Sequence, residues 1–398
     1  MSALKVALLT ATVAALAVAS GQPVLFHLTD VLAATLIVAA LWSWLGVRGL
    51  HLERHLRQDR AQVGGTVDQR LVLHARIPFP RVWIEIEDTG TLPDYRIGRV
   101  IPLGLTGVRS WSISAPCRRR GLYRLGPAHL RASDPFGLFT CSRRLDAVAS
   151  VLVYPATVAL TGLTLPAGQL LGGDRRRTGW HQTASHVSGV RDYHPGDPVR
   201  HVHWRATAHA GRLMVKEFDV EPVADIWIFL DAEARVQRGE GDESTEEYGV
   251  TIAASLARHF LADGRAVGMV AVASQRRIVI PADRGQRQLI KLLEELAILR
   301  ADGEEPIAEI LAAESQRCSR HAALIIITPS LDEAWPATLQ GLRERGIQAG
   351  AVVLEPSTFG EAPSSILLVG TLAMLGIPSI LVKRGDQIGS VLSAGWRG

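Results

Sequence analysis

The feature that most constrains the fold is a pair of apolar stretches at the N-terminus. Residues 3–20 are apolar apart from Lys5 and small hydroxyl residues, and residues 28–47 form a second run that carries Trp42 and Trp44 near its end. A helix needs about 20 apolar residues to cross a bilayer, and tryptophan favours the membrane interface. We therefore expect two transmembrane helices within residues 1–50, joined by a short uncharged loop at residues 21–27.

The first stretch also has another interpretation. It is the shorter of the two, and Ala17-Val18-Ala19 resembles a signal-peptidase site, so a cleaved signal followed by one anchor stays open. For the hairpin, the flanking charges set the topology, because Lys and Arg are retained on the cytoplasmic side. This predicts a multi-pass protein of the cell membrane with the large C-terminal part in the cytoplasm. The flanking residues are Lys5 before the first span and Arg48, Arg54, Arg57 and Arg60 after the second.

Composition agrees with membrane attachment and narrows the choice of partners. Hydrophobic residues make up 47% of the 398 residues, and the excess is concentrated at the N-terminus. The formal net charge is only +4, and no long basic face with interleaved aromatics is present. We therefore expect membrane lipid and no nucleic acid among the partners, with Arg48 to Arg60 facing lipid head groups. Cys117, Cys141 and Cys318 are too widely spaced for a disulfide framework or a paired zinc motif.

The remainder predicts a multi-domain α+β chain. Residues 51–160 alternate apolar and polar positions, as at Leu71, Leu73, Ile84 and Ile86, with frequent Pro and Gly, which is typical of a sandwich-like β domain. Residues 161–222 form a Gly-rich linker and a charged segment. Residues 223–398 alternate apolar strands with amphipathic helices, which predicts a doubly wound α/β domain. Its expected strands are residues 226–231, 266–273, 323–328, 347–354 and 379–382, with an edge strand at 276–280.

Residues 191–216, which we name the signature segment, combine many charges with Tyr193 and Trp204. Isolated charges are rarely buried, so these must pair with one another or bind a partner. We expect an ion-paired unit with Trp204 in its interior, Asp197 capping a helical turn, and Arg200 stacked on Trp204. The segment would tie two domains together or dock a partner. Its key residues are Arg191, Tyr193, Gly196, Asp197, Arg200, Trp204 and Arg205.

These residues support a family resemblance. The Tyr-x-x-Gly-Asp-x-x-Arg-x-x-x-Trp core of the signature segment, together with residues 118–139 and 151–155, resembles the domain of unknown function 58 family. The resemblance covers about residues 63–231. It implies a membrane-anchored bacterial protein with two N-terminal helices, a β-rich region and a domain similar to the von Willebrand factor type A fold, encoded beside a MoxR-type AAA+ ATPase. It supplies no catalytic residue.

The type A resemblance implies a specific test for a metal site. Such domains bind Mg²⁺ through Asp-x-Ser-x-Ser after the first strand, and hard cations prefer oxygen ligands. Here the loop is Asp231-Ala232-Glu233-Ala234-Arg235, without either serine. Asp231, Ser330 and Asp332 are the weak metal candidates, and we expect no cofactor.

Two enzymatic or adhesive alternatives stay open beside a binding role. His181, His186, His194, His201, His203 and His209 crowd one region, and His201 and His203 would share a strand face, as in a metal-dependent hydrolase. An Mg²⁺-dependent adhesion-type module is the other. Because no catalytic motif is recognisable, we expect a non-enzymatic adaptor whose type A-like domain binds a protein, with a MoxR-type ATPase as the partner implied by the family.

Overall fold

The computed structural model describes residues 2–104, 107–163, 186–194, 202–219, 225–274, 276–319 and 322–396. The chain divides into two compact units. The first is Met1–Thr157 with Lys291–Leu299, and the second is Val158–Ile290 with Arg300–Gly398. The expected mixed α+β architecture, with two apolar N-terminal helices and several sheets, is confirmed.

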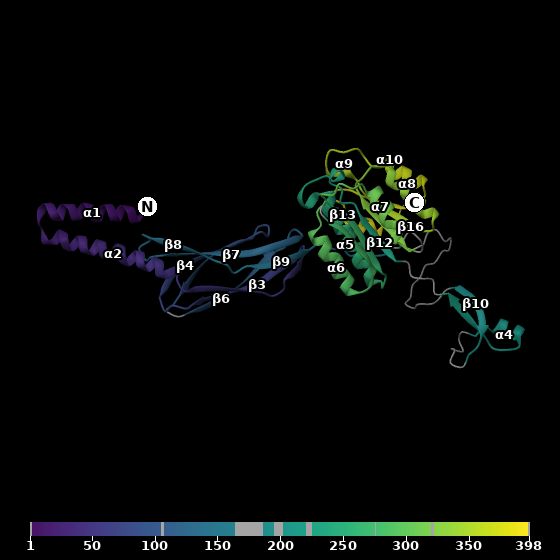
Figure 1. Cartoon of the computed structure of the whole chain (residues 1–398), viewed down its shortest axis with the longest axis horizontal. Helices are drawn as coiled ribbons and strands as arrows, with labels where there is room; N and C mark the ends of the chain where they lie inside the picture. Colours follow the sequence, from purple (N-terminus) through teal and green to yellow (C-terminus); the bar gives the residue numbers. More distant parts are fainter. Residues whose placement is uncertain are drawn as a thin grey trace. The chain divides into compact units, whose positions relative to one another are not determined.

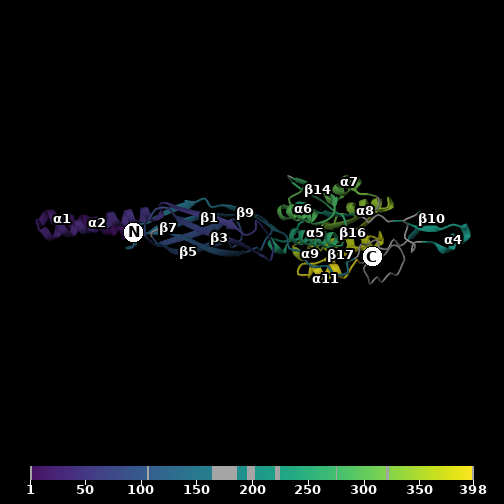
Figure 2. The same ribbon diagram turned by 90° about the horizontal axis from the view of Figure 1, so that it is seen from below.

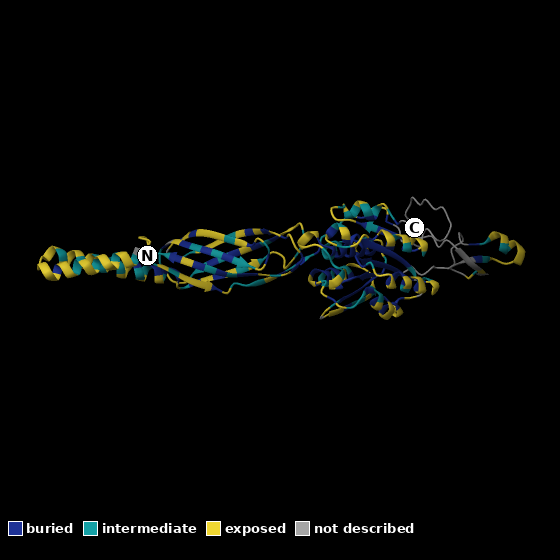
Figure 3. Cartoon of the chain, turned by 90° about the horizontal axis from the view of Figure 1, so that it is seen from above, coloured by how far each residue is buried: buried dark blue, intermediate teal, exposed yellow. Residues whose placement is uncertain are grey.

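Two apolar helices, α1 (Ser2–Ser20) and α2 (Pro23–Val47), open the chain and lie side by side (Figure 1). Only Gly21 and Gln22 separate them, so the expected loop at residues 21–27 is too long. Pro23 occupies a first helical position, where its fixed φ and missing N–H suit a helix start. Both helices have the length and hydropathy of a membrane span, and most of their side chains are exposed (Figure 3). Apolar surface of this extent calls for a covering of lipid or protein.

A two-sheet β sandwich follows α2 directly, beginning at Leu50 (Figure 2). One sheet has the order β1-β3-β6, and the other has the order β2-β9-β7-β4-β5, with β8 paired to β7. Alternate apolar side chains of both sheets, among them Leu71, Leu73, Ile84 and Leu130, form the core between them. The strands are β1 (Leu50–Leu56), β2 (Arg60–Gln62), β3 (Thr66–Ala75), β4 (Arg81–Gly90), β5 (Arg96–Leu103), β6 (Val108–Pro116), β7 (Gly121–Ser133), β8 (Thr140–Leu145) and β9 (Ala149–Tyr154).

Arg54 lies inside this sandwich, which corrects the expectation that Arg48 to Arg60 face lipid. Its side chain is 2% exposed and donates through Nη2 to Oδ1 of Asp88 at 2.6 Å. Gln69 and the hydroxyl of Tyr95 complete the network around the pair. Arg60 begins β2 and pairs with Glu294 at 2.8 Å instead. Proximity to α2 in sequence was therefore a poor guide, because β1 carries the chain away from the helix end.

The end of α2 is bonded to the sandwich through Arg81, the first residue of β4. Its guanidinium, 2% exposed, donates to the carbonyl oxygens of Gly46 at 3.0 Å and Arg48 at 2.7 Å. It also donates to the carbonyl oxygens of Ile77 and Phe79, both at 3.1 Å. The last carbonyl groups of a helix have no hydrogen-bond donor within the helix, and the Arg81 guanidinium is a donor to them here.

The second unit contains a six-stranded sheet of order β14-β13-β12-β15-β16-β17. All pairings are parallel except that of β13 with the edge strand β14. Each expected strand of residues 226–382 is present within three residues of its predicted bounds. The strands are β12 (Ile226–Leu230), β13 (Val267–Ala273), β14 (Arg276–Asp283), β15 (Ala323–Thr328), β16 (Gln348–Leu354) and β17 (Ser379–Val382).

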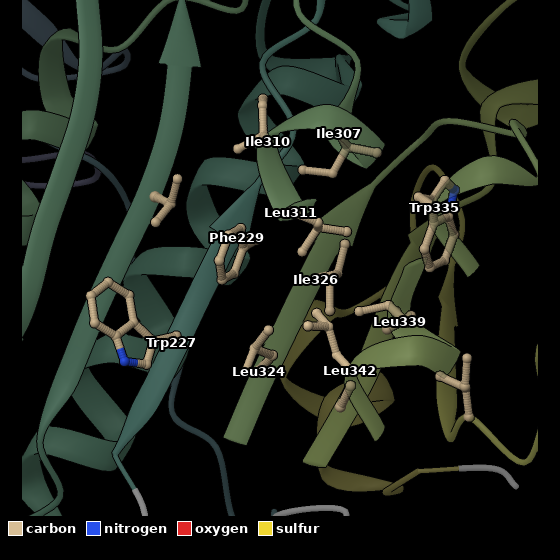
Figure 4. Packing of buried hydrophobic residues seen from close by; sticks show 14 of the residues in the cluster. Trp227, Phe229, Ile307, Ile310, Leu311, Leu324, Ile326, Trp335, Leu339 and Leu342 are labelled. Carbon is tan, nitrogen blue, oxygen red and sulfur yellow. The ribbon is translucent and has the colours of Figure 1, made fainter. Parts of the chain in front are cut away.

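Helices cover both faces of this sheet, as the sequence predicts for a doubly wound domain. Trp227, Phe229, Leu324 and Ile326 pack on one face against α7, α8 and α10 (Figure 4). The alternate residues, such as Leu230 and Ile327, face α5 at Gly249. The helices of this part of the chain are α5 (Thr245–Ala262), α7 (Ile307–Glu314), α8 (Ala334–Glu344), α9 (Pro356–Phe359), α10 (Ile366–Met374) and α11 (Ile388–Ser393), and α6 (Gln286–Ile298) belongs to the first unit from Lys291 on.

Candidate functional site

The strand order of the parallel sheet reverses at one point of its carboxyl edge. The chain runs from β12 to β13 on one side, whereas β15 lies on the other side of β12, so the order reverses between β12 and β15. Ligands of open α/β sheets bind at such a reversal, outside the carboxyl ends of the strands. Asp231 follows β12 and Thr328 ends β15, so both lie at this point.

Asp231 and Thr328 bond to each other at this reversal of strand order. The Thr328 hydroxyl donates to Asp231 Oδ2 at 2.5 Å, and the N–H of Glu233 donates to Oδ1 at 3.0 Å. Asp231 is 4% exposed and Thr328 is fully buried. Burial raises the pKa of Asp231 to about 6, more than these two hydrogen bonds lower it, and the Glu233 carboxylate acts in the same direction as burial. The Asp231 carboxyl therefore keeps its proton to a higher pH than a free carboxyl does, and it joins two strand ends.

The three weak metal candidates do not converge on one point. The Thr328 hydroxyl accepts from the N–H of Ser330 at 2.8 Å, and Ser330 Oγ accepts from the N–H of Asp332 at 3.3 Å. Asp332 Oδ1 accepts from Ala334, at the start of α8. The side-chain oxygens of Thr328, Ser330 and Asp332 thus each accept a hydrogen bond from a backbone N–H two residues further along the loop. Glu233 is paired with Arg235 at 3.1 Å, which brings positive charge to the same loop.

This donor set does not fit Mg²⁺, which demands a near-octahedral arrangement of oxygen ligands. Within the described ranges, no group of three or more His, Cys, Asp or Glu side chains is placed to hold a metal ion. The structure therefore brings Asp231, Thr328 and Ser330 together as a hydrogen-bonded loop support.

A second buried carboxylate, which the sequence interpretation missed, follows the neighbouring strand. Glu355 lies just after β16 and is 3% exposed. Burial acts to raise the pKa of Glu355, but hydrogen bonds from Ser357 and Ser365 outweigh it and lower that pKa. The Ser365 N–H also donates to Glu355 Oε1 at 3.1 Å, so the carboxylate stabilises the start of α10. Ser357, Ser364 and Ser365, all before the helix and within ten residues of a strand-end glutamate, were the available signal.

The described part of the signature segment is a small β hairpin with a helix. Strands β10 (His186–Asp192) and β11 (Met214–Asp219) pair antiparallel, and α4 (Trp204–Ala210) lies between them in sequence. Arg191 is in β10, opposite Val215. The N–H of Tyr193 donates to the carbonyl of Leu213 at 2.9 Å. Arg205 is exposed on α4.

Trp204 is 66% exposed, so the expectation that it lies in the interior of an ion-paired unit is wrong. Arg212 and Asp192 do pair, at 3.1 Å, but both are at least half exposed. Helix α4 begins at Trp204, and its N-cap is His203, whose Nδ1 accepts from the N–H of Ala206. The Asp197 cap is therefore not the one observed. Gly196, Asp197 and Arg200, with the stacking expected of Arg200, lie outside the described residues.

The histidines do not form a described cluster. His203 caps α4, His209 is in its last turn, and His194 Nδ1 lies 3.1 Å from the carbonyl oxygen of Asp192. His203 precedes a helix, so it does not share a strand face with His201 as expected. His181 and His201 lie outside the described residues.

Helix α10 has an exposed apolar face, which the sequence interpretation overlooked. Only Leu368 and Leu372 of this helix are buried. Ile366, Leu367 and Met374 are 71%, 83% and 82% exposed and share one face, because their positions fall within about 100° of one another around the helix axis. The run ILLVGTLAM is apolar throughout apart from one threonine, which was the available signal.

The architecture defines an α+β protein with two apolar N-terminal helices, a β sandwich and a doubly wound domain. A family model described as protein of unknown function DUF58 matches residues 189–356. A Bacillus subtilis (strain 168) relative, the uncharacterized protein YeaD, is 24% identical over 340 residues, which is 82% of each chain. These two matches support a DUF58 family protein, as the sequence resemblance implies.

Two solved structures resemble about a quarter of the chain. The CARDB domain of the PF1109 protein from Pyrococcus furiosus is 12% identical, covers 26% of this chain and 91% of that chain, and has a TM-score of 0.20. The C-terminal domain of wzt is 12% identical, covers 27% of this chain and 75% of that chain, and has a TM-score of 0.23. Similarity at this level supports no inference about fold or function.

Proposed function

We propose that this protein is a membrane-anchored, non-enzymatic adaptor whose α/β domain binds a protein partner during complex assembly or maturation. The partner we propose is a MoxR-type AAA+ ATPase, on the family resemblance alone. The observation that carries the docking role is the exposed apolar face of α10, with Ile366, Leu367 and Met374. Contiguous exposed apolar side chains are costly on a soluble surface and mark interaction sites.

We propose further that the doubly wound domain is of the von Willebrand factor type A kind and works without a metal. Supporting features are the parallel sheet with one antiparallel edge strand and an aspartate after the first strand, β12. At the equivalent of the metal site, Asp231 is bonded to Thr328 and to the Glu233 amide, and Arg235 pairs with Glu233. These contacts take the place that cation ligation would have.

The proposed topology puts the sandwich and the α/β domain in the cytoplasm. Lys5 near the start of α1 and Arg48 after α2 lie on the same side of a two-helix hairpin. Because both flanks carry basic residues and the connecting loop has none, the positive-inside tendency places both flanks inside.

Direct binding of the full chain, in detergent micelles, to the purified MoxR-type ATPase of the same host tests the docking role. Leu367→Asp and Met374→Asp place a charge on the α10 face without touching the core, and each should weaken binding by about tenfold or more, since a buried unpaired charge costs several kcal/mol. Leu122→Asp is the matched control, because Leu122 is 65% exposed on the sandwich.

The control should bind as the parent does, and circular dichroism should be the same for all four proteins. If the parent does not bind the ATPase, the proposed partner is wrong. If the parent binds and the α10 variants bind equally well, docking uses another surface, and Trp204 on α4 is the next residue to change.

A further inference from the structure

The end of the sandwich nearest α2 carries apolar side chains that its fold does not use. Four large ones are exposed: Ile77 at 37%, Trp83 at 60%, Val108 at 61% and Phe136 at 65%. They come from three separate parts of the sandwich, namely the β3–β4 connection with the start of β4, the start of β6, and the β7–β8 turn. These apolar side chains are far apart in sequence, so the fold itself brings them to one end of the sandwich.

Contacts place these segments beside the end of α2. The N–H of Arg76 donates to the carbonyl of Gly49 at 2.8 Å, and that of Ala75 donates to the carbonyl of Gly107 at 3.0 Å. Ile77 and Val108 therefore flank the residues that follow α2. Trp83 lies two residues beyond Arg81, which donates to the Gly46 carbonyl.

The β7–β8 hairpin reaches further, alongside the helix itself (Figure 1). Ser43 Oγ lies 3.6 Å from Cys141 Sγ, and a Cβ on Gly46 would lie 2.9 Å from that of Ala132. Ala132 and Cys141 are paired in register, so the hairpin meets α2 at residues 43–46. The turn beyond them extends about 7–10 Å further along α2, at about 3.3 Å per residue.

The length of α2 puts that turn at the membrane boundary. Its 25 residues make a helix about 37 Å long, whereas the hydrocarbon core is about 30 Å thick. The last turn, where Ser43 and Gly46 touch the hairpin, is therefore left in the interface. Phe136 is exposed at the tip of this hairpin.

Basic side chains surround the apolar ones. Arg48, Arg76, Arg109 and Arg143 are exposed at this end of the sandwich, and the Arg48 guanidinium lies 3.6 Å from the centre of the Trp44 ring. The carboxylate of the β7–β8 turn, Asp134, is 4% exposed and accepts from the N–H groups of Phe136 and Phe139, so it does not oppose anions at the surface.

From this arrangement we propose that the α2-proximal end of the sandwich is a lipid-contact surface. Phe136 inserts into the interfacial layer together with Ile77, Trp83 and Val108 of the same end of the sandwich, and Arg48, Arg76, Arg109 and Arg143 bind the phosphates of anionic lipids. The inference rests on the proposed membrane anchoring by α1 and α2, and it goes further by assigning a bilayer contact to the β domain.

Spin labels on the full chain in phosphatidylcholine–phosphatidylglycerol liposomes test it, through collision with oxygen, which enriches in lipid, and with a water-soluble nickel chelate. Phe136→Cys is the test position, and Leu122→Cys, equally exposed at 65% near the opposite end of β7, is the matched control. Ile37→Cys, 67% exposed on α2, reports whether the helix spans the membrane. All label positions are made in a Cys141→Ser background, which removes the half-buried native thiol. The Cys141→Ser protein without an added cysteine measures any labelling of Cys117 and Cys318, which are buried.

We expect the oxygen-to-nickel accessibility ratio at residue 136 to be several-fold above that at residue 122, and to fall when phosphatidylglycerol is left out. If residue 37 is in lipid and residue 136 is as wet as residue 122, the lipid-contact surface is wrong and the anchor stands. If residue 37 is itself wet, the anchor fails and the surface fails with it. If residue 136 is in lipid with or without phosphatidylglycerol, the arginine contacts to anionic phosphate are wrong.

Discussion

Arg54 and Asp88 form an ion pair between the two sheets of the sandwich, with Nη2 and Oδ1 2.6 Å apart and both side chains at most 2% exposed. Arg54 belongs to β1 and Asp88 to β4, so the pair crosses the interior rather than running along one sheet. Burial acts to lower the pKa of Arg54, but Asp88 and Tyr95 outweigh it and raise that pKa. Burial raises the pKa of Tyr95 to about 12, so its hydroxyl keeps its proton as a donor to Asp88.

Replacing one partner of this pair should therefore destabilise the sandwich strongly. Arg54→Met leaves the Asp88 carboxylate buried without its cation, which costs about 3–5 kcal/mol. Hydrogen exchange of the full chain, followed by mass spectrometry on the peptides of β1 and β4, should accelerate accordingly. The control is Arg96→Met, because Arg96 pairs with Glu87 at the surface, is 79% exposed, and should matter by at most about 1 kcal/mol. Equal exchange in the two variants would contradict the interior role of Arg54.

Trp204→Ala should leave the stability of the protein nearly unchanged. Its side chain is 66% exposed, and surface substitutions usually change stability by about 0.5 kcal/mol or less. Val215→Ala, in the paired strand β11, is the comparison, because Val215 is 3% exposed and its truncation removes buried contacts. Hydrogen exchange across β10 and β11 should rise for Val215→Ala only. A large effect of Trp204→Ala would mean that residues beyond the described part of the segment cover this side chain.

Asp231 should give the stability of the protein a distinct pH dependence. Its folded pKa of about 6 lies above the ordinary 3.8, so the folded state holds the proton more tightly between these values. The stabilising contribution is present below pH 4 and is lost as the pH rises through 6, by about 3 kcal/mol. Urea unfolding of the parent and of Asp231→Asn, in detergent from pH 4 to 8, measures the difference. The parent should lose stability relative to the variant as pH rises, and a constant difference would contradict the raised pKa.

The strands of the α/β domain were predictable because of how parallel sheets are buried. A strand covered on both faces is a continuous apolar run, and β15 has the predicted bounds, Ala323–Thr328. Asp231 was equally recognisable as a residue after such a run. Its bond to Thr328 was not, because the two are 97 residues apart and no spacing rule joins them.

Misassigned residues share a different cause, which is that composition does not report which way a side chain faces. Arg54 follows an apolar helix, as a head-group-binding arginine would, but its partner Asp88 is 34 residues away on another sheet. Trp204 lies among charges that suggested a buried cluster, yet α4 has seven residues and buries none of them. The exposed face of α10 was missed for the converse reason, since an apolar run of nine residues signals an apolar helix but does not say which of its faces lacks cover.

The four carbonyl contacts of Arg81 have a mechanical consequence. A helix that entered the sandwich through a pliable linker could tilt or turn while the domain stayed still. Here the carbonyl oxygens of Gly46 and Arg48 are held by the same guanidinium that holds those of Ile77 and Phe79. Helix α2 and the sandwich are therefore rigidly coupled, and a rotation of the helix about its axis turns the β domain with it.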